Sequence, residues 1–137
     1  MFKPILGIKS KTGVLHFRRW RILSTPWFSI YLHGIYKADS DIHLHDHPWD
    51  YLSIILSGSF LEETVDHNGC QTVNLMKPGS SVRRKAEQFH KIKDMITPKV
   101  HTLFITKKPR RDWGYNVDGK WMQHDDYRKW IHLNKKS

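Results

Sequence analysis

The feature that most constrains the fold is a series of short β-prone segments separated by turn residues. Glycine or proline, often beside a small polar residue, interrupts the chain between successive apolar runs. Many short strands at this spacing predict a β-sandwich or β-barrel. A helical pattern occurs only at 123–131, so we expect an all-β core followed by a short C-terminal helix or extension. The expected strands lie at 14–23, 27–33, 51–57, 59–65, 71–76, 82–86 and 100–106.

The length and cysteine content favour one domain in a reducing compartment. With 137 residues, the chain can enclose one core but not two. The single cysteine, Cys70, excludes an internal disulfide, and we expect it to be exposed in a hairpin turn. No apolar run is long enough for a membrane span or a signal peptide, which predicts a cytoplasmic protein with no membrane partner.

The charge of the chain predicts an anionic ligand. Lys and Arg number 23 against 13 Asp and Glu, a formal net charge of +10. Such an excess attracts phosphates, carboxylates or nucleic acid, although solubility alone also accounts for it. The cations are scattered, and no motif organises them for nucleic-acid recognition. We therefore expect a small anionic substrate or ligand, and not nucleic acid.

Three alternating histidines, His43, His45 and His47, are the main chemical signal. Residues two apart on an extended strand point to the same side, so two of these imidazoles can reach one metal ion. Imidazole binds iron, zinc, nickel and copper well. Alternation alone leaves the pair open: His43 with His45, or His45 with His47.

The segment from His45 to His90 resembles the two sequence motifs of the cupin superfamily. His45-Asp46-His47 and the later Gly58 follow the order of the first motif. Residues 77–90, KPGSSVRRKAEQFH, match the second motif without a gap. The resemblance implies a double-stranded β-helix, a small jelly-roll barrel, with His45, His47 and His90 as metal ligands. The His-Asp-His-Pro-Trp run is also similar to that of small single-domain cupins from bacterial and phage genomes, which for a phage protein implies the host cytoplasm.

The resemblance also implies how the chain is organised and which cofactor it binds. It implies N-terminal strands at 1–36, the cupin motifs and barrel at 43–106, and an extension at 107–137. The bound group is expected to be a divalent metal, with iron(II) as first choice and zinc, nickel or manganese as alternatives. Cupins often pair through their barrel faces, so a homodimer is expected.

One ligand position departs from the family pattern. Tyr51 occupies the place where cupins usually carry a glutamate. The site then has three histidines alone, recruits Asp50 from the turn, or uses Glu62. We predict Asp50 as the additional ligand, and Tyr51 as a catalytic residue.

Strand parity also predicts which other side chains point into the barrel. Arg84 shares its parity with Val82 and His90, so an inward guanidinium could clamp a carboxylate or phosphate, and we include it as catalytic. His33 and His101 could also line the barrel, but a structural role is the expectation for both.

Three functions fit these observations. The first is an iron(II)-dependent oxygenase acting on a small anionic substrate. The second is an isomerase or epimerase of a nucleotide sugar, with a histidine base and a tyrosine acid. The third is a non-catalytic barrel that binds or sequesters a small anion or nucleotide.

Overall fold

Short antiparallel strands make up most of the chain. The computed structural model describes residues 6–9, 15–39, 43–66 and 68–135. Within them, the elements in chain order are β1 Leu6–Lys9, β2 Leu15–Ser24, β3 Phe28–Ile35, β4 Tyr51–Ser57, β5 Phe60–Val65, β6 Gln71–Met76, β7 Ser81–Arg84, β8 Phe89–Met95, β9 Val100–Lys107, β10 Gly114–Val117, β11 Lys120–Gln123 and α1 His124–Lys135.

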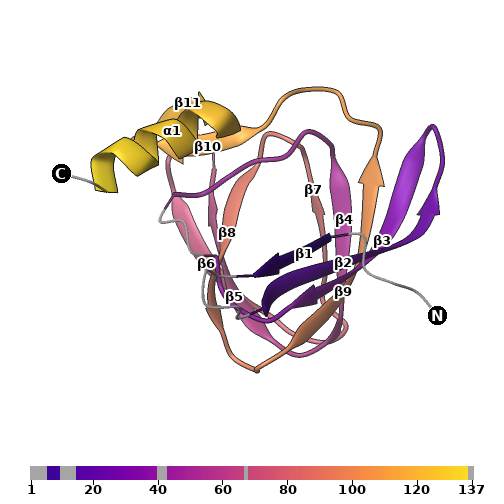
Figure 1. The fold of residues 1–137 in the computed structure, drawn as a ribbon. Helices are drawn as coiled ribbons and strands as arrows, with labels where there is room; N and C mark the ends of the chain where they lie inside the picture. The colour runs from indigo at the N-terminus through magenta and orange to yellow at the C-terminus, as the bar shows by residue number, and fades with distance from the viewer. Residues whose placement is uncertain (1–5, 10–14, 40–42, 67, 136–137) are drawn as a thin grey trace.

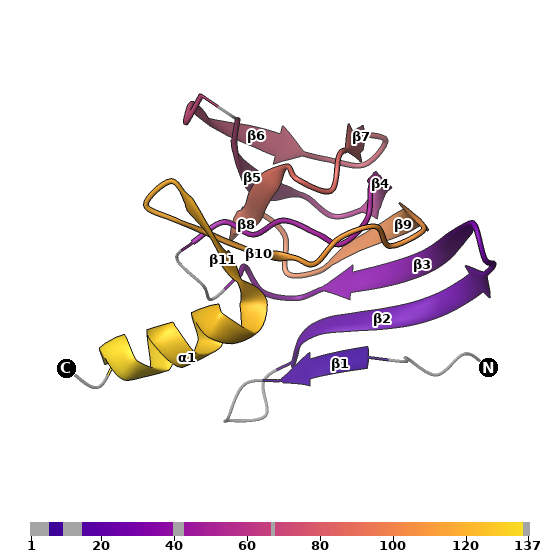
Figure 2. The same cartoon turned by 90° about the horizontal axis from the view of Figure 1, so that it is seen from above.

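The strands form two sheets that face each other, and a separate hairpin. One sheet has the order β1-β2-β3-β9-β4-β7, and the other has the order β6-β5-β8. All pairs are antiparallel, and Figure 1 shows the strands curving around a common interior. The β10–β11 hairpin and α1 lie together at one end, apart from the long β2–β3 hairpin (Figure 2). The prediction of an all-β barrel with a short C-terminal helix is confirmed.

The main core lies between the two sheets and follows the period of two that strands impose. Along β9 the buried positions alternate from Val100 to Thr106, and β4 buries Tyr51, Ser53 and Ile55 in the same way. The central cluster comprises Ile35, Ile55, Phe60, Met76 and Val100. Buried strand residues of this kind leave their neighbours, such as His101, on the outer face. His101 therefore does not line the barrel; its ring lies beside Tyr36 and Ser57.

The turn after β4 requires glycine. Gly58 has φ +79°, in the left-handed region that side chains disfavour. A Cβ at this position would overlap the carbonyl oxygen of Lys99. The turn thus holds β4 close to the start of β9, which fixes how these neighbouring strands pair.

A second apolar cluster attaches the C-terminal helix to the barrel. Tyr127 of α1 is 1% exposed and stacks on Tyr115 of β10 at 3.8 Å between ring centroids. The side chain of Gln123 accepts hydrogen bonds from the amides of Asp125 and Asp126, which caps the first turn of α1. Within the described ranges, none of the helices has the length and apolar character that crossing a bilayer demands.

Candidate metal centre

The His-Asp-His segment is held in place by backbone hydrogen bonds on both sides. His45 exchanges two of them with His90, at 3.0 and 2.9 Å. On its other side, the amide of Asp46 donates to the carbonyl of Gly114 at 3.0 Å. This isolated bridge keeps the segment extended, so the side chains of His45 and His47 point to one side and that of Asp46 to the other.

Three imidazoles converge as a result. One ring nitrogen from each of His45, His47 and His90 lies within 4.8 Å of the other two. The Nε2 atoms of His47 and His90 are 2.7 Å apart. Two nitrogens that bind one ion at about 2.1 Å and at right angles are about 3.0 Å apart, so this spacing is close to that of a shared metal. His45, His47 and His90 can thus hold a metal ion.

The third alternating histidine is not part of the triad. His43 Nδ1 lies 2.9 Å from the hydroxyl of Tyr127, and its ring packs against Trp130. The choice that alternation left open is therefore settled in favour of His45 with His47. His43 instead connects the segment to the C-terminal helix.

Burial keeps His45 and His47 in the state that binds metals. Desolvation, and then the neighbouring charge of His90, lower the pKa of His45 to about 4. Desolvation also places the pKa of His47 well below its usual value, with smaller contributions from His90, His45 and Arg19. Both imidazoles are neutral at pH 7, and neutral imidazole is the metal-binding form.

Glu62 lies behind His90, not beside its metal-facing nitrogen. Its Oε2 accepts a hydrogen bond from His90 Nδ1 at 3.0 Å, and Oε1 pairs with the guanidinium of Arg84. Burial alone would raise the pKa of Glu62, but His90 and Arg84 hold it below its usual range. A proton on Nδ1 leaves Nε2 of His90 free as a ligand, which is how carboxylates commonly orient metal-binding histidines.

Arg84 points inward, as strand parity predicted, but it already has a partner. Along β7, Val82 and Arg84 are the less exposed positions. The guanidinium pairs with Glu62, which leaves its positive charge largely neutralised inside the barrel. The nearby Glu87 carboxylate does not pair with Arg84; it binds Arg110.

Tyr51 faces the triad. It is 4% exposed, and its hydroxyl lies 3.4 Å from His90 Nε2. Burial, and then the negative charge of Glu62, raise the pKa of this phenol well above its usual value. Tyr51 therefore stays protonated at all ordinary pH values and can donate a hydrogen bond beside the triad.

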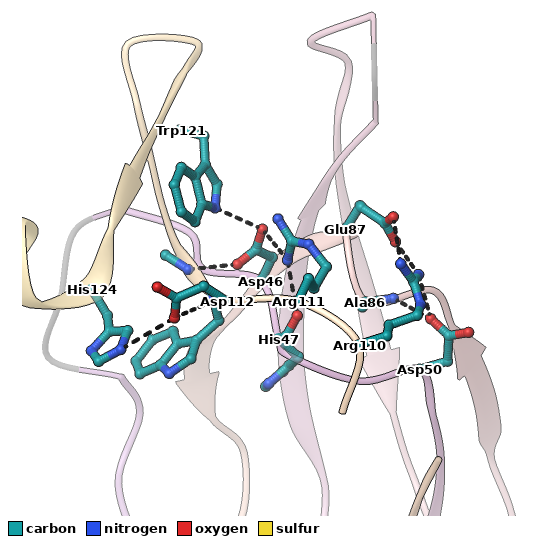
Figure 3. A network of polar contacts seen from close by, with 12 residues as sticks. Asp46, His47, Asp50, Ala86, Glu87, Arg110, Arg111, Asp112, Trp121 and His124 are labelled. Carbon is teal, nitrogen blue, oxygen red and sulfur yellow. Dashed lines mark hydrogen bonds and ion pairs between the residues drawn. The ribbon is translucent and has the colours of Figure 1, made fainter. Parts of the chain in front are cut away.

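The structure does not bring Asp50 to the triad. Its carboxylate accepts a hydrogen bond from the amide of Ala86 at 2.7 Å and pairs with Arg110 at 2.8 Å (Figure 3). These contacts lower the pKa of Asp50, with the Arg110 hydrogen bond as the main cause. Asp50 lies at the start of β4, one position from Tyr51, and neighbouring strand residues point in opposite directions. Its carboxylate therefore supports the turn beside the site.

A buried carboxylate between the two histidines was not foreseen. Asp46 is 1% exposed and accepts hydrogen bonds from the amide of Gly114 at 2.7 Å and from Trp121 Nε1 at 3.0 Å. Arg111 pairs with it at 2.8 Å and also donates to the carbonyl of His47 (Figure 3). Burial raises the pKa of Asp46, and the Gly114 and Arg111 contacts oppose this. The network fastens the 110–123 segment across the histidine segment.

Aromatic rings surround the triad on the barrel side. Trp49 stacks on the ring of His47 at 4.7 Å, and Tyr51 stacks on Phe104 at 4.7 Å. Phe104 also stacks on His33, which is 5% exposed. These rings exclude water from the inner side of the triad and restrict the positions that its imidazoles can take.

Comparisons with known proteins find similar folds among solved structures but no match by sequence. No sequence-family model matches the chain, and no curated protein matches it. Among solved structures, a protein of Ralstonia eutropha JMP134 described as a candidate mannose-6-phosphate isomerase is 18% identical, with a TM-score of 0.58 over 67% of this chain and 84% of that one.

Two further structures have the same architecture. KdgF from a Halomonas species is 18% identical, with a TM-score of 0.56 over 78% of this chain and 88% of that one. The iron(II) form of HppE is 13% identical, with a TM-score of 0.58 over 74% of this chain. This chain spans only 55% of the HppE chain. With a histidine triad inside its barrel, the chain has the cupin fold.

Proposed function

We propose that this protein is a metal-dependent cupin enzyme, an oxygenase that uses iron(II) and acts on a small anionic substrate. The observation that carries the proposal is the convergence of three histidine nitrogens within 4.8 Å inside a barrel. The chain's resemblance to the cupin motifs and its likeness to the iron(II) form of HppE support iron as the metal.

The donor set suits such a metal. Three neutral imidazoles bind iron(II) and occupy only part of its coordination sphere, which leaves positions for substrate and oxygen. Iron(II) bound there would supply the redox chemistry that amino-acid side chains lack. The protein's own contribution is to bind, orient and shield the reacting groups.

The residues around the triad have distinct tasks in this scheme. Glu62 holds the proton on His90 Nδ1 and so keeps Nε2 directed at the site. Tyr51 donates a hydrogen bond to the bound substrate from its hydroxyl, which lies 3.4 Å from His90 Nε2. Trp49 and Phe104 keep the inner side of the triad dry, which strengthens these polar contacts.

The contact between Tyr51 and His90 favours a second candidate, a sugar isomerase. A histidine base and a tyrosine acid at this separation can move a proton on and off a sugar carbon. The similarity in fold to the isomerase-named Ralstonia protein agrees with this alternative. In that case His90 must act without being bound to a metal.

Metal content and oxygen uptake test the proposal. Protein produced without a histidine tag is expected to contain about one iron per chain and to consume oxygen with a carboxylate or phosphate substrate from a panel of small anions. His90→Ala should lose both the iron and the oxygen uptake. His101→Ala, which removes a histidine from the outer face, should keep both.

Other outcomes would contradict the proposal. Wild-type protein that binds no iron when supplied with it would exclude the metalloenzyme. Iron binding without oxygen uptake, together with isomerase activity that survives iron removal, would favour the sugar isomerase.

A further inference from the structure

A partly buried arginine lies on the inner face of the β2–β3 pair. Arg19 of β2 is directly opposite His33 of β3, and Phe17 is opposite Ile35. Ile35 belongs to the central core, and Phe17 packs against it. Because residues two apart on a strand share a face, the side chain of Arg19 also lies on the inner face.

Aromatic contacts connect this arginine to the metal centre. Arg19 Nε donates to His33 Nε2 at 3.0 Å, and its guanidinium lies 4.8 Å from the centre of the Tyr31 ring. His33 stacks on Phe104 with 4.5 Å between the ring centroids. The ring centroid of Phe104 lies 6.4 Å from that of the triad residue His47. Arg19 and His33 thus adjoin the wall of rings that borders the triad.

The guanidinium of Arg19 has no counter-ion in the part of the chain that the structure describes. No carboxylate there pairs with it, and its two terminal nitrogens have no hydrogen-bond partner among those residues. Partly buried arginines are normally paired, because removing an unpaired charge from water is costly. An arginine positioned by a histidine and a tyrosine ring, with both terminal nitrogens unpaired among the described residues, is suited to receive an anion.

The charges on this inner face favour a monoanion. Arg84 is neutralised by Glu62. Burial, and then the charge of Arg19, lower the pKa of His33 to about 3, so His33 is neutral at pH 7. Arg19 then contributes a single uncompensated positive charge, which matches a carboxylate better than a doubly charged phosphate.

We infer that Arg19, positioned by His33 and Tyr31, binds the carboxylate of the substrate. This inference rests on the proposed function, because it places the anionic group of the substrate beside the histidine triad. The planar fork of Arg19 accepts a carboxylate through two parallel hydrogen bonds. The substrate class is therefore a small carboxylic acid.

Anion titrations followed by NMR test the inference on the full-length protein, both metal-free and loaded with zinc. Acetate and inorganic phosphate are added separately at constant ionic strength. The Nε–H signal of Arg19 is followed in wild type, and the backbone amide signals of Tyr31 and His33 are followed in wild type and in every variant. In the metal-free protein, acetate should shift the Arg19 signal saturably and bind more tightly than phosphate. Arg19→Gln should weaken acetate binding at least about tenfold, since a charge-assisted hydrogen-bonded pair is lost.

Two variants separate a specific site from general charge and from folding. Arg18→Gln removes the same charge from the exposed face of the same strand and should leave acetate affinity unchanged. Arg19→Lys keeps the charge without the planar fork and should bind acetate with intermediate affinity. If Arg19→Gln does not fold, the lysine variant still decides the question.

Zinc affinity distinguishes this inference from the proposed function. Arg19→Gln should bind zinc at least as tightly as wild type, since a nearby cation opposes a dication. Equal loss of acetate binding in Arg18→Gln, no saturable shift in wild type, or tighter binding of phosphate would overturn the inference. Failure of wild type to bind metal would instead overturn the proposed function and leave the acetate result standing.

Discussion

Replacement of Asp46 by asparagine should destabilise the fold strongly, although the change is nearly isosteric. The carboxylate is buried and accepts hydrogen bonds from Gly114 and Trp121 while pairing with Arg111. Asparagine keeps one acceptor oxygen but turns the other position into a donor. That donor faces groups that are themselves donors, and the partner arginine keeps its charge without a counter-ion.

The magnitude follows from the loss of one partner of a buried ion pair. Such a loss costs about 3–5 kcal/mol, and asparagine keeps one acceptor, so we take about 3 kcal/mol. At about 2.1 cal/mol/K for each of 137 residues, the unfolding entropy is about 0.29 kcal/mol/K. Dividing the first quantity by the second gives a decrease in Tm of about 10 °C.

Thermal unfolding by circular dichroism and urea unfolding by tryptophan fluorescence, both on metal-free protein, measure the effect. The matched control is Asp112→Asn, because Asp112 carries the same charge nearby but its side chain is 54% exposed. The control should change the free energy of unfolding by less than about 0.5 kcal/mol. If Asp46→Asn behaves like the control, the carboxylate does not fasten the 110–123 segment to the barrel, and the reasoning fails.

Three further results are expected. Glu62→Gln should weaken zinc affinity about 10- to 100-fold in a competition titration, because His90 loses the carboxylate that orients it; unchanged affinity would contradict this role. His33 has a pKa of about 3 in the folded protein, against an ordinary value of 6.5. Between these two values the unfolded chain binds up to one more proton than the folded protein. The free energy of unfolding therefore decreases as the pH is lowered through this range, by up to about 1.4 kcal/mol per pH unit from this residue. His33→Gln should therefore reduce the loss of stability between pH 6 and pH 5, measured by urea unfolding, by about 1.2 kcal/mol, and an unaltered pH dependence would refute the assignment. Gly58→Ala should lower the free energy of unfolding by more than about 3 kcal/mol, because the new Cβ overlaps the Lys99 carbonyl and the backbone has positive φ. Gly79→Ala has positive φ but open space around the Cβ, and should lower it by about 1–2 kcal/mol in the same assay. Equal losses would show that backbone strain alone decides the effect.

Much of the barrel was accessible from the sequence because strand periodicity and turn residues are local signals. The apolar run at 51–57 has the same bounds as β4, and the predicted strand at 71–76 has the same bounds as β6. The β10–β11 hairpin was missed although its signal was present. Asp118-Gly119 takes positive φ at both positions, the conformation that Asp-Gly favours in two-residue hairpin turns.

The triad could be anticipated, but the contacts that support it could not. His45 and His47 are related by strand parity, and the motif spacing to His90 supplied the third member. Glu62 and Arg84 meet His90 only through the register of β5 with β8 and the curvature of the sheets, which no local pattern encodes. The sequence drew attention to Asp50, since acidic residues near a histidine pair are common ligands, while the position of Arg110 decides its actual contacts.

The proposed function requires that one metal ion binds between His45, His47 and His90. Anomalous diffraction from a crystal of iron-loaded protein, measured on both sides of the iron absorption edge, tests it most directly. One strong peak per chain is expected at about 2.1 Å from a ring nitrogen of each of the three histidines. A peak at another group of side chains, or an empty triad in protein shown to contain iron, would contradict it.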